Sequence, residues 1–303
     1  MNQAEQIPAA PARWPGQRGK LGDYWMLTKP EVNLLVVMST LVGFYLGADG
    51  PIRLGLLLNT LIGTLLVASG TATLNEYVER AHDARMRRTA SRPLPAGRIS
   101  PRAGLCFGLA LSAGGGIYLA LTVNRLASFL ALLTLALYLV LYTPLKRKTP
   151  LCTLVGAFPG AIPPLIGWAA ARGSLSFEAW ILFALLFFWQ FPHFTAIAWM
   201  YRHDYSRAGY LMLPPADQQG RFMATQVAGF SLLLIPVSVI PTLLGQAGLV
   251  YLFGAIVLGI GFLYYSCRLA ISRSNFGARR VLLASVIYLP LLFILMMVNK
   301  LPA

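Results

Sequence analysis

The fold is decided by residues 54–88, where the apolar run LGLLLNTLIGTLLVASGTATL (54–74) leads without a break into NEYVERAHDARMRR (75–88). A helix that crosses a bilayer needs roughly 20 mostly apolar residues, and the first part of this stretch meets that length. The second part brings carboxylates and arginines together directly after it. The stretch therefore predicts a membrane-spanning helix followed by a charged segment at the membrane surface. We call this segment, residues 75–98, the charged mouth.

Composition extends this prediction to the whole chain. The 303 residues are 57% hydrophobic and only 12% charged, whereas soluble domains carry about 25% charged residues. This balance excludes a soluble globular enzyme and a disordered chain. We predict an all-α, polytopic membrane protein with nine transmembrane helices, because eight further segments reach spanning length: 32–48, 103–122, 126–143, 152–170, 177–200, 224–244, 248–270 and 281–298.

The net charge of +15 has its explanation in topology. A nucleic-acid-binding domain of this charge would be polar and rich in lysine, so we expect no nucleic-acid partner. With nine helices, 21 of the 25 basic residues fall on one side of the membrane, which the positive-inside rule identifies as the cytoplasm. We therefore expect a cytoplasmic N-terminus and a C-terminus on the opposite side. Residues 1–28, polar and without a cleavable signal pattern, are expected to be a flexible cytoplasmic segment before the domain at 29–303.

The charged mouth holds oxygen ligands at helical spacing. Asn75, Glu79 and Asp83 differ in direction by only about 40° and 80° around a helix, so all three face one way. Mg²⁺ takes one or two carboxylates and completes its shell with water and substrate phosphates. The arginines of the same segment suit phosphate oxygens: Arg80, Arg85, Arg87, Arg88, Arg92 and Arg98. The alternative is a solvated loop whose charges pair with one another and fix topology.

A second group of ionisable residues ends the fourth apolar segment, in YTPLKRKTP at 142–150. Arg147 and Lys148 are explained by topology alone. Lys146 lies closest to the apolar segment and is the best candidate there for binding a diphosphate, because ionisable groups at membrane depth mark functional sites.

The third group is WQFPHFTAIAWMYRHDYSRAG at 189–209. His193 lies inside the sixth apolar segment, where it is either a hydrogen-bonded structural residue or a functional one. Asp204 is the only carboxylate of the group, which makes it a candidate either for a second metal or for orienting Arg202.

These segments together resemble the UbiA superfamily of intramembrane prenyltransferases. The pattern N-x-x-x-E-x-x-x-D-x-x-M-x-R-T-x-x-R-P-L from Asn75 to Leu94 looks like the superfamily's first aspartate-rich motif. YWMLTKPEV at 24–32, YTPLKRKT at 142–149, GAFPGAIPPLIGW at 156–168 and WQFPHFTAIAWMYRHDYSRAGYLMLP at 189–214 are similar to the branch that farnesylates haem b. The resemblance runs from about residue 24 to the C-terminus.

The resemblance implies a nine-helix bundle around a central, lipid-open cavity in a bacterial-type inner membrane. It implies that Mg²⁺ held by Asn75, Glu79 and Asp83 helps farnesyl diphosphate to ionise, and that a vinyl carbon of haem b attacks the allylic cation. Water would then capture the second cation, giving haem O. The diphosphate partners carried over are Arg87, Arg88, Lys146 and Arg202. A haem A synthase and terminal oxidase assembly proteins are candidate partners.

One departure from the superfamily pattern concerns the second motif. Members that prenylate small aromatic rings carry two or more aspartates there, and the matching stretch here retains only Asp204. A two-metal arrangement therefore stays open, with Asp204 as the further Mg²⁺ ligand. We assign catalytic roles to Asn75, Glu79, Asp83, His193 and Asp204, and we hypothesise that His193 contacts haem as an iron ligand or as a base.

Two alternatives remain at this point. One is prenylation of another acceptor, such as a quinone precursor or a chlorophyllide, against which the sparse second motif and FPHF at 191–194 count. The other is a membrane transporter or haem carrier, which leaves the one-sided face of carboxylates beside six arginines unexplained.

Overall fold

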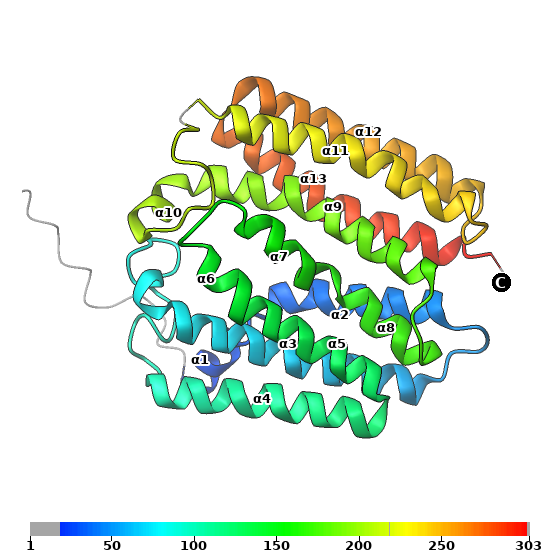
Figure 1. The fold of residues 1–303 in the computed structure, drawn as a ribbon, viewed down its shortest axis with the longest axis horizontal. Helices are drawn as coiled ribbons and strands as arrows, with labels where there is room; N and C mark the ends of the chain where they lie inside the picture. The colour runs from blue at the N-terminus through cyan, green and yellow to red at the C-terminus, as the bar shows by residue number, and fades with distance from the viewer. Residues whose placement is uncertain (1–18, 218, 302–303) are drawn as a thin grey trace, which may run out of the picture.

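A computed structural model describes residues 19–217 and 219–301 and contains a bundle of roughly parallel and antiparallel helices (Figure 1). Apart from one isolated bridge between Ala247 and Lys300, the described residues form helices and their connections. Nine helical spans in this part of the chain are long and apolar enough to cross a membrane. Large apolar side chains cover the outside of the bundle, as on α12 (Leu249–Ser272), where Val257 and Ile271 are exposed. The chain is a multi-pass membrane protein.

The spans agree with the nine predicted from the sequence to within a few residues at most ends. Two of them are interrupted: the fourth consists of α5, a π-helix (η1) and α6, and the fifth consists of α7 and α8. The helices are α1 (Lys20–Leu27), α2 (Pro30–Gly47), α3 (Leu54–Asp83), α4 (Pro101–Thr122), α5 (Arg125–Ala136), η1 (Leu137–Tyr142), α6 (Thr143–Leu145), α7 (Cys152–Ala161), α8 (Pro163–Arg172), α9 (Phe177–Met200), α10 (Arg202–Ala208), α11 (Arg221–Leu243), α12 (Leu249–Ser272) and α13 (Asn275–Val298).

The N-terminal part differs from the prediction of a flexible segment through residue 28. Residues 20–27 form α1, in which Leu27 is fully buried and Asp23 accepts a 2.8 Å hydrogen bond from Nε of Arg98. Burial of this apolar side chain and the partly buried ion pair between Asp23 and Arg98 hold this short helix against the bundle. Residues 1–18 of the expected segment lie outside the described residues.

Close helix contacts hold α2 against α8. A Cβ atom at Gly43 would lie 2.0 Å from the carbonyl oxygen of Pro164, and one at Gly167 would lie 1.9 Å from that of Thr40. Only glycine permits this approach of two backbones, and small residues at helix contacts are typical of membrane bundles. These contacts fix α2, and with it the residues that precede α2 at the charged end.

The polar connections gather at one end of the bundle, on the left in Figure 1. This end carries α1, the connection 84–100 that follows α3, the connection 146–151 and α10, whereas the C-terminus lies at the opposite end. The three ionisable groups singled out in the sequence therefore belong largely to one end of the molecule.

Candidate active site

The last turns of α3 carry Asn75, Glu79 and Asp83 into the interior of the charged end. The helix continues nine residues beyond the apolar run, so the three residues do share one helix, as their spacing predicts. Their exposed fractions are only 2%, 6% and 1%. Buried carboxylates need partners, and the surrounding elements supply them.

Two cations pair with the two carboxylates. Nζ of Lys146, just after α6, donates to Oε1 and Oε2 of Glu79 at 2.9 and 3.1 Å. Nη1 of Arg92, in the connection after α3, donates to Oδ2 of Asp83 at 2.7 Å. The Lys146–Glu79 pair is buried, and removing one partner of such a pair generally costs about 3–5 kcal/mol, because the other charge is left without compensation. The Arg92–Asp83 pair is only partly buried. The oxygen ligands of the charged mouth therefore lie in a buried, organised cluster. Its charges do pair with one another, as the alternative interpretation also predicted, and Arg85, Arg87 and Arg88 remain exposed.

The amide of Asn75 links the cluster to two further elements. Its Oδ1 accepts from Nζ of Lys29 at 3.4 Å, and its Nδ2 donates to Oγ1 of Thr143 on α6 at 3.3 Å. Lys29 has the left-handed backbone conformation φ 49°, ψ 61° directly before Pro30. This conformation is unfavourable for a residue with a Cβ atom, and backbone outliers of this kind concentrate at functional sites.

Burial lowers the pKa of each of the three cations, and neighbouring charges either add to that shift or oppose it. Burial, together with repulsion from Arg92 and Lys146, lowers the pKa of Lys29 to about 8. Burial also opposes the charge on Arg92, but the Asp83 carboxylate outweighs it and raises the pKa of Arg92. Lys146 is likewise desolvated, and attraction to groups that include the Glu79 carboxylate holds its pKa well above the ordinary value. Arg92 and Lys146 are thus fixed as cations.

The π-helix η1 positions aromatic rings beside Lys146. Its Nζ lies 4.5 Å from the ring centre of Tyr142 and 5.7 Å from that of Tyr138, both within the range of cation–π attraction. A Cβ atom at Gly156 of α7 would lie 2.6 Å from the Tyr142 ring, so glycine is required for the ring to lie there. Single π-turns inside α-helices occur frequently at functional sites.

The predicted diphosphate residues differ in where they lie. Lys146 belongs to the buried cluster. Arg88 donates from Nη2 to the hydroxyl of Tyr205 on α10 at 2.9 Å and lies 4.5 Å from the ring centre of Tyr201. Arg88 therefore connects the end of α3 with α10. Arg87 is exposed on the same connection.

One of the two predictions for Asp204 was that it orients Arg202, but the two side chains have other partners. Nη1 of Arg202 donates to the carbonyl of Trp199 and to Oδ1 of Asn275, both at 2.8 Å. Asp204 instead forms an ion pair with Arg207. The prediction that Asp204 orients Arg202 is wrong, because a partner on the same helix, three residues on, takes its carboxylate.

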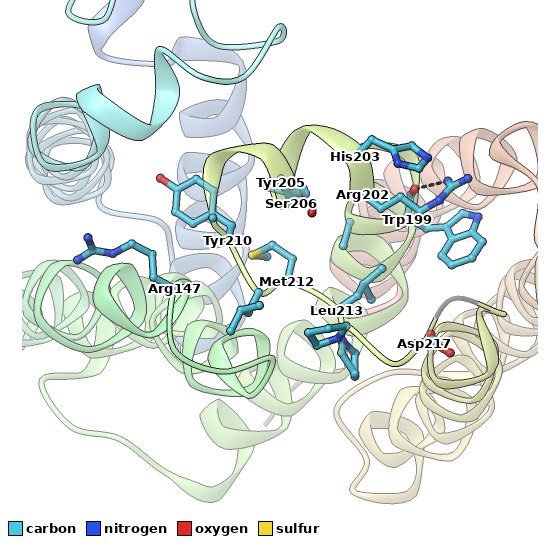
Figure 2. Close-up of a pocket in the computed structure, with 15 residues that line it drawn as sticks. Arg147, Trp199, Arg202, His203, Tyr205, Ser206, Tyr210, Met212, Leu213 and Asp217 are labelled. Atoms are coloured by element: carbon cyan, nitrogen blue, oxygen red, sulfur yellow. Dashed lines mark hydrogen bonds between the residues drawn. The ribbon is translucent and has the colours of Figure 1, made fainter. Parts of the chain in front are cut away.

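A pocket of about 560 Å³ opens beside α10 (Figure 2). Its wall is mixed in character, with cations from two elements, apolar side chains of the segment after α10, and the indole of Trp199. Lining residues include Arg147, Arg202, His203, Tyr210, Met212 and Asp217. The carboxylate of Asp217 accepts from the backbone N–H groups of Phe222 and Met223 at the start of α11, which fixes the far wall.

His193 lies apart from the carboxylates, in the middle of α9. Its Nδ1 is 2.8 Å from Oγ of Ser285 on α13, and its ring stacks on Trp189 with 4.7 Å between ring centres. The side chain is half-buried. Both sequence-based interpretations survive, since a hydrogen bond to one nitrogen leaves the other nitrogen available.

Sequence reasoning missed Lys29 and Thr143 and did not distinguish Arg92 from its neighbours. Lys29 and Thr143 lie 46 and 68 residues from Asn75, so no local spacing could link them. The available signal for Lys29 is its place before Pro30 at the start of a span. The signal for Arg92 is weaker, since six arginines share its segment.

The family scan and the relatives decide the family. The model of the UbiA prenyltransferase family matches residues 36–298. The chain belongs to the UbiA prenyltransferase family. It is 50% identical over 287 residues to the protoheme IX farnesyltransferase of Solibacter usitatus, covering 92% of this chain and 98% of that protein. It is 46% identical to that of Salinibacter ruber, over 92% and 99% of the two chains. The family is one of enzymes, which removes the transporter interpretation.

Solved structures show the same UbiA fold. A digeranylgeranylglyceryl phosphate synthase matches with a TM-score of 0.76 at 18% identity, covering 93% of this chain and 99% of that one. A UbiA homolog from Archaeoglobus fulgidus bound to GPP and Mg²⁺ matches with a TM-score of 0.67 at 16% identity, over 90% and 99% of the chains. The predicted UbiA-type, all-helical architecture is confirmed.

The donor set at the end of α3 suits Mg²⁺. Across the described ranges, no three His, Cys, Asp or Glu side chains group closely enough to hold a metal ion by themselves. Two carboxylates and one amide oxygen on one face match the preference of Mg²⁺ for few protein ligands plus water and phosphate. The residues present therefore fit a magnesium–diphosphate site.

Proposed function

We propose that this UbiA-family enzyme transfers the farnesyl group of farnesyl diphosphate to a vinyl group of haem b, with addition of water, to give haem O. The acceptor is supported by relatives 50% and 46% identical to this chain that bear the name protoheme IX farnesyltransferase. The prenyl donor is supported by the buried cluster at the end of α3.

The observation that carries the proposal is that one buried cation, Lys146, and two half-buried ones, Lys29 and Arg92, face two buried carboxylates and an amide. Leaving-group departure breaks the C1–O bond, and the electron pair stays on the diphosphate. Lys29, Arg92 and Lys146 are held within the protein before substrate arrives, so they stabilise this charge without reorganisation. The aromatic rings over Lys146 keep water away from it, and this strengthens its attraction for an anion.

Mg²⁺ is assigned to the oxygens of Asn75, Glu79 and Asp83, with Asp204 as a further candidate ligand. When bound, the metal supplies Lewis-acid stabilisation of the leaving diphosphate. Glu79 and Asp83 would exchange their cation partners for the metal, and this frees Lys146 and Arg92 to bind phosphate oxygens. Asp204 would have to leave Arg207 to take part.

The diphosphate partners are Lys146, Arg88, Arg87 and Arg202, with Lys29 and Arg92 added from the structure. Arg88 is attached to Tyr205 on α10, so an anion that draws in Arg88 also draws α10 towards α3. Arg87 is free to move because it is exposed. Arg202 lines the pocket beside α10 and suits the outer side of the diphosphate.

Carbon–carbon bond formation follows ionisation. The π electrons of a haem vinyl group attack C1 of the farnesyl cation, and water adds to the resulting cation and releases one proton. Aromatic side chains of α9 suit a wall for these cations, since they do not react with them. Phe191 stacks on Phe230 of α11 with 3.9 Å between ring centres. His193 is assigned to the haem side of this wall.

We assign the enzyme to the cell inner membrane, with the charged end and the N-terminus in the cytoplasm. Twenty-one of the 25 basic residues support this orientation. A water-soluble diphosphate reaches the cluster from that side, while the farnesyl chain lies among apolar helices. A haem A synthase or terminal oxidase assembly proteins remain the candidate partners, since such proteins would consume the product.

A product assay tests the proposal. The purified protein in lipid nanodiscs receives haem b, farnesyl diphosphate, Mg²⁺ and H₂¹⁸O, and mass spectrometry follows the porphyrin products. We expect a hydroxyethylfarnesyl porphyrin that carries ¹⁸O in its hydroxyl group. Absence of any farnesylated porphyrin while a quinone precursor is prenylated would overturn the assignment of the acceptor.

A further inference from the structure

Ser285 of α13 holds both aromatic rings of one face of α9. Its backbone carbonyl accepts a 2.9 Å hydrogen bond from Nε1 of Trp189, and its Oγ lies 2.8 Å from Nδ1 of His193. The two rings stack at 4.7 Å with 26° between their planes. Ser285 is fully buried, so a single residue fixes the orientation of the His193 ring.

The direction of the hydrogen bonds determines which nitrogen of His193 carries the proton. Oγ of Ser285 lies 2.6 Å from the carbonyl oxygen of Leu282. A carbonyl can only accept, so the single hydroxyl proton of Ser285 is used there. Towards His193 the oxygen therefore accepts, and Nδ1 must be the donor. The other nitrogen, Nε2, then holds a lone pair.

We propose that Ser285 is a positioning residue that locks His193 in this tautomer, so that Nε2 binds the iron of the porphyrin acceptor. The proposal rests on the proposed function, because it takes haem to be the acceptor. Histidines that bind metals almost always donate their other ring N–H to a fixed acceptor, which sets the tautomer and the ring orientation. Here the acceptor is a serine hydroxyl on the neighbouring helix.

The surroundings favour an iron ligand over a general base. A base that takes a proton becomes an imidazolium, which needs a counter-charge when it is removed from water. His193 packs against the rings of Trp189 and Phe194 and is within hydrogen-bond distance of the hydroxyl of Ser285, and none of these groups is acidic. Iron binding leaves the ring neutral, which this environment accepts.

Absorption spectroscopy of haem b bound to the full-length protein in nanodiscs tests the proposal without any need for turnover. The wild type should give the Soret band of a histidine-bound haem, and His193→Gly should lose it and regain it when imidazole is added. Ser285→Ala retains the carbonyl that holds Trp189 and removes only the hydroxyl. It should weaken haem binding by roughly 10-fold or more and shift the spectrum, whereas Ser285→Thr should restore both.

Ser266→Ala is the matched control, because it removes a buried serine hydroxyl bonded to Ser231 at 2.8 Å on helices that do not carry His193. It should leave the spectrum unchanged. A wild-type spectrum and affinity in Ser285→Ala, or in His193→Gly without imidazole, would overturn the proposal even if haem O is formed. The inverse result, iron ligation by His193 with no farnesyl transfer, would leave this inference standing and remove the proposed function.

Discussion

The end of α3 and the middle of α9 differ in the chemistry of their side chains: the first is charged and the second is largely aromatic and apolar. At the end of α3, Glu79 and Asp83 are buried in ion pairs with Lys146 and Arg92. Along α9, His193 is the one ionisable side chain between residues 179 and 200, and its contacts are aromatic rings and a serine. The first region suits a charged group that must leave, and the second suits a flat, largely apolar molecule.

This difference indicates a division of labour. Ionisation of an allylic diphosphate needs charges that are in place beforehand, and these would trap or quench a carbocation if they lay along the whole length of the bundle. Keeping them at one end of the bundle leaves aromatic walls for the cation and its acceptor. The two regions should therefore be separable by experiment.

The largest expected effect is that of metal removal. Chelation of Mg²⁺ should lower farnesyl transfer by about 10³-fold or more, because the leaving diphosphate loses its strongest counter-charge. The Soret band of bound haem should not change. Turnover measured with EDTA, with and without added Mg²⁺, tests this, and farnesyl transfer that persists in EDTA would contradict the assignment of a magnesium site.

Glu79→Gln should lower turnover by roughly 10²- to 10³-fold, because it removes a proposed metal ligand. It also leaves Lys146 without its carboxylate, so thermal stability must be measured alongside. Glu31→Gln, an exposed carboxylate in the first turn of α2, is the control and should retain wild-type activity. Equal activities of Glu79→Gln and Glu31→Gln would contradict the assignment of Glu79 to the site of ionisation.

Lys146→Met should lower turnover by about 10²-fold with haem binding retained, since one preorganised cation is lost. Lys148→Met provides the control, because this neighbouring lysine is exposed. Steady-state kinetics with farnesyl diphosphate separate the two variants. A loss in Lys148→Met as large as that in Lys146→Met would mean that general positive charge, and not the buried position, is what matters.

Tyr205→Phe should have the smallest effect, a decrease of roughly 2- to 10-fold in kcat/KM for farnesyl diphosphate, the value of one hydrogen bond. The hydroxyl that it removes accepts from Arg88. The control Tyr265→Phe, on the outer face of α12, should leave kcat/KM for farnesyl diphosphate unchanged. An unchanged kcat/KM in Tyr205→Phe would show that α10 contributes nothing through Arg88.

Much of the fold was predictable because lipid imposes a simple rule on composition. Apolar runs located all nine spans, and the spacing of Asn75, Glu79 and Asp83 correctly predicted one helical face. The predicted helix ends were less accurate where a helix continues beyond its apolar part, as α3 does to Asp83. Order in α1 was missed, because it depends on Asp23 meeting Arg98, 75 residues away.

The site was predictable only as far as local spacing reaches. The motif on α3 and the place of Lys146 next to an apolar run were both readable. Lys29 and Ser285 were not, since a lysine before a proline and a serine in an apolar helix carry no local sign of their partners. The carboxylate of Asp204 pairs with Arg207, which is three residues on and lies on the same side of the helix. Arg202, two residues before Asp204, faces another side, so the partner that we had expected was the wrong one.

The most direct test of the division of labour is to measure both binding reactions on two variants. Isothermal titration would follow Mg²⁺-dependent binding of farnesyl diphosphate, and absorption would follow haem b, for Glu79→Gln and His193→Gly. We predict that Glu79→Gln loses the first and retains the second, and that His193→Gly does the reverse. Two results would contradict the assignment of the two regions. One is a His193→Gly variant that loses diphosphate binding and keeps the haem spectrum, and the other is a Glu79→Gln variant that loses the haem spectrum and keeps diphosphate binding.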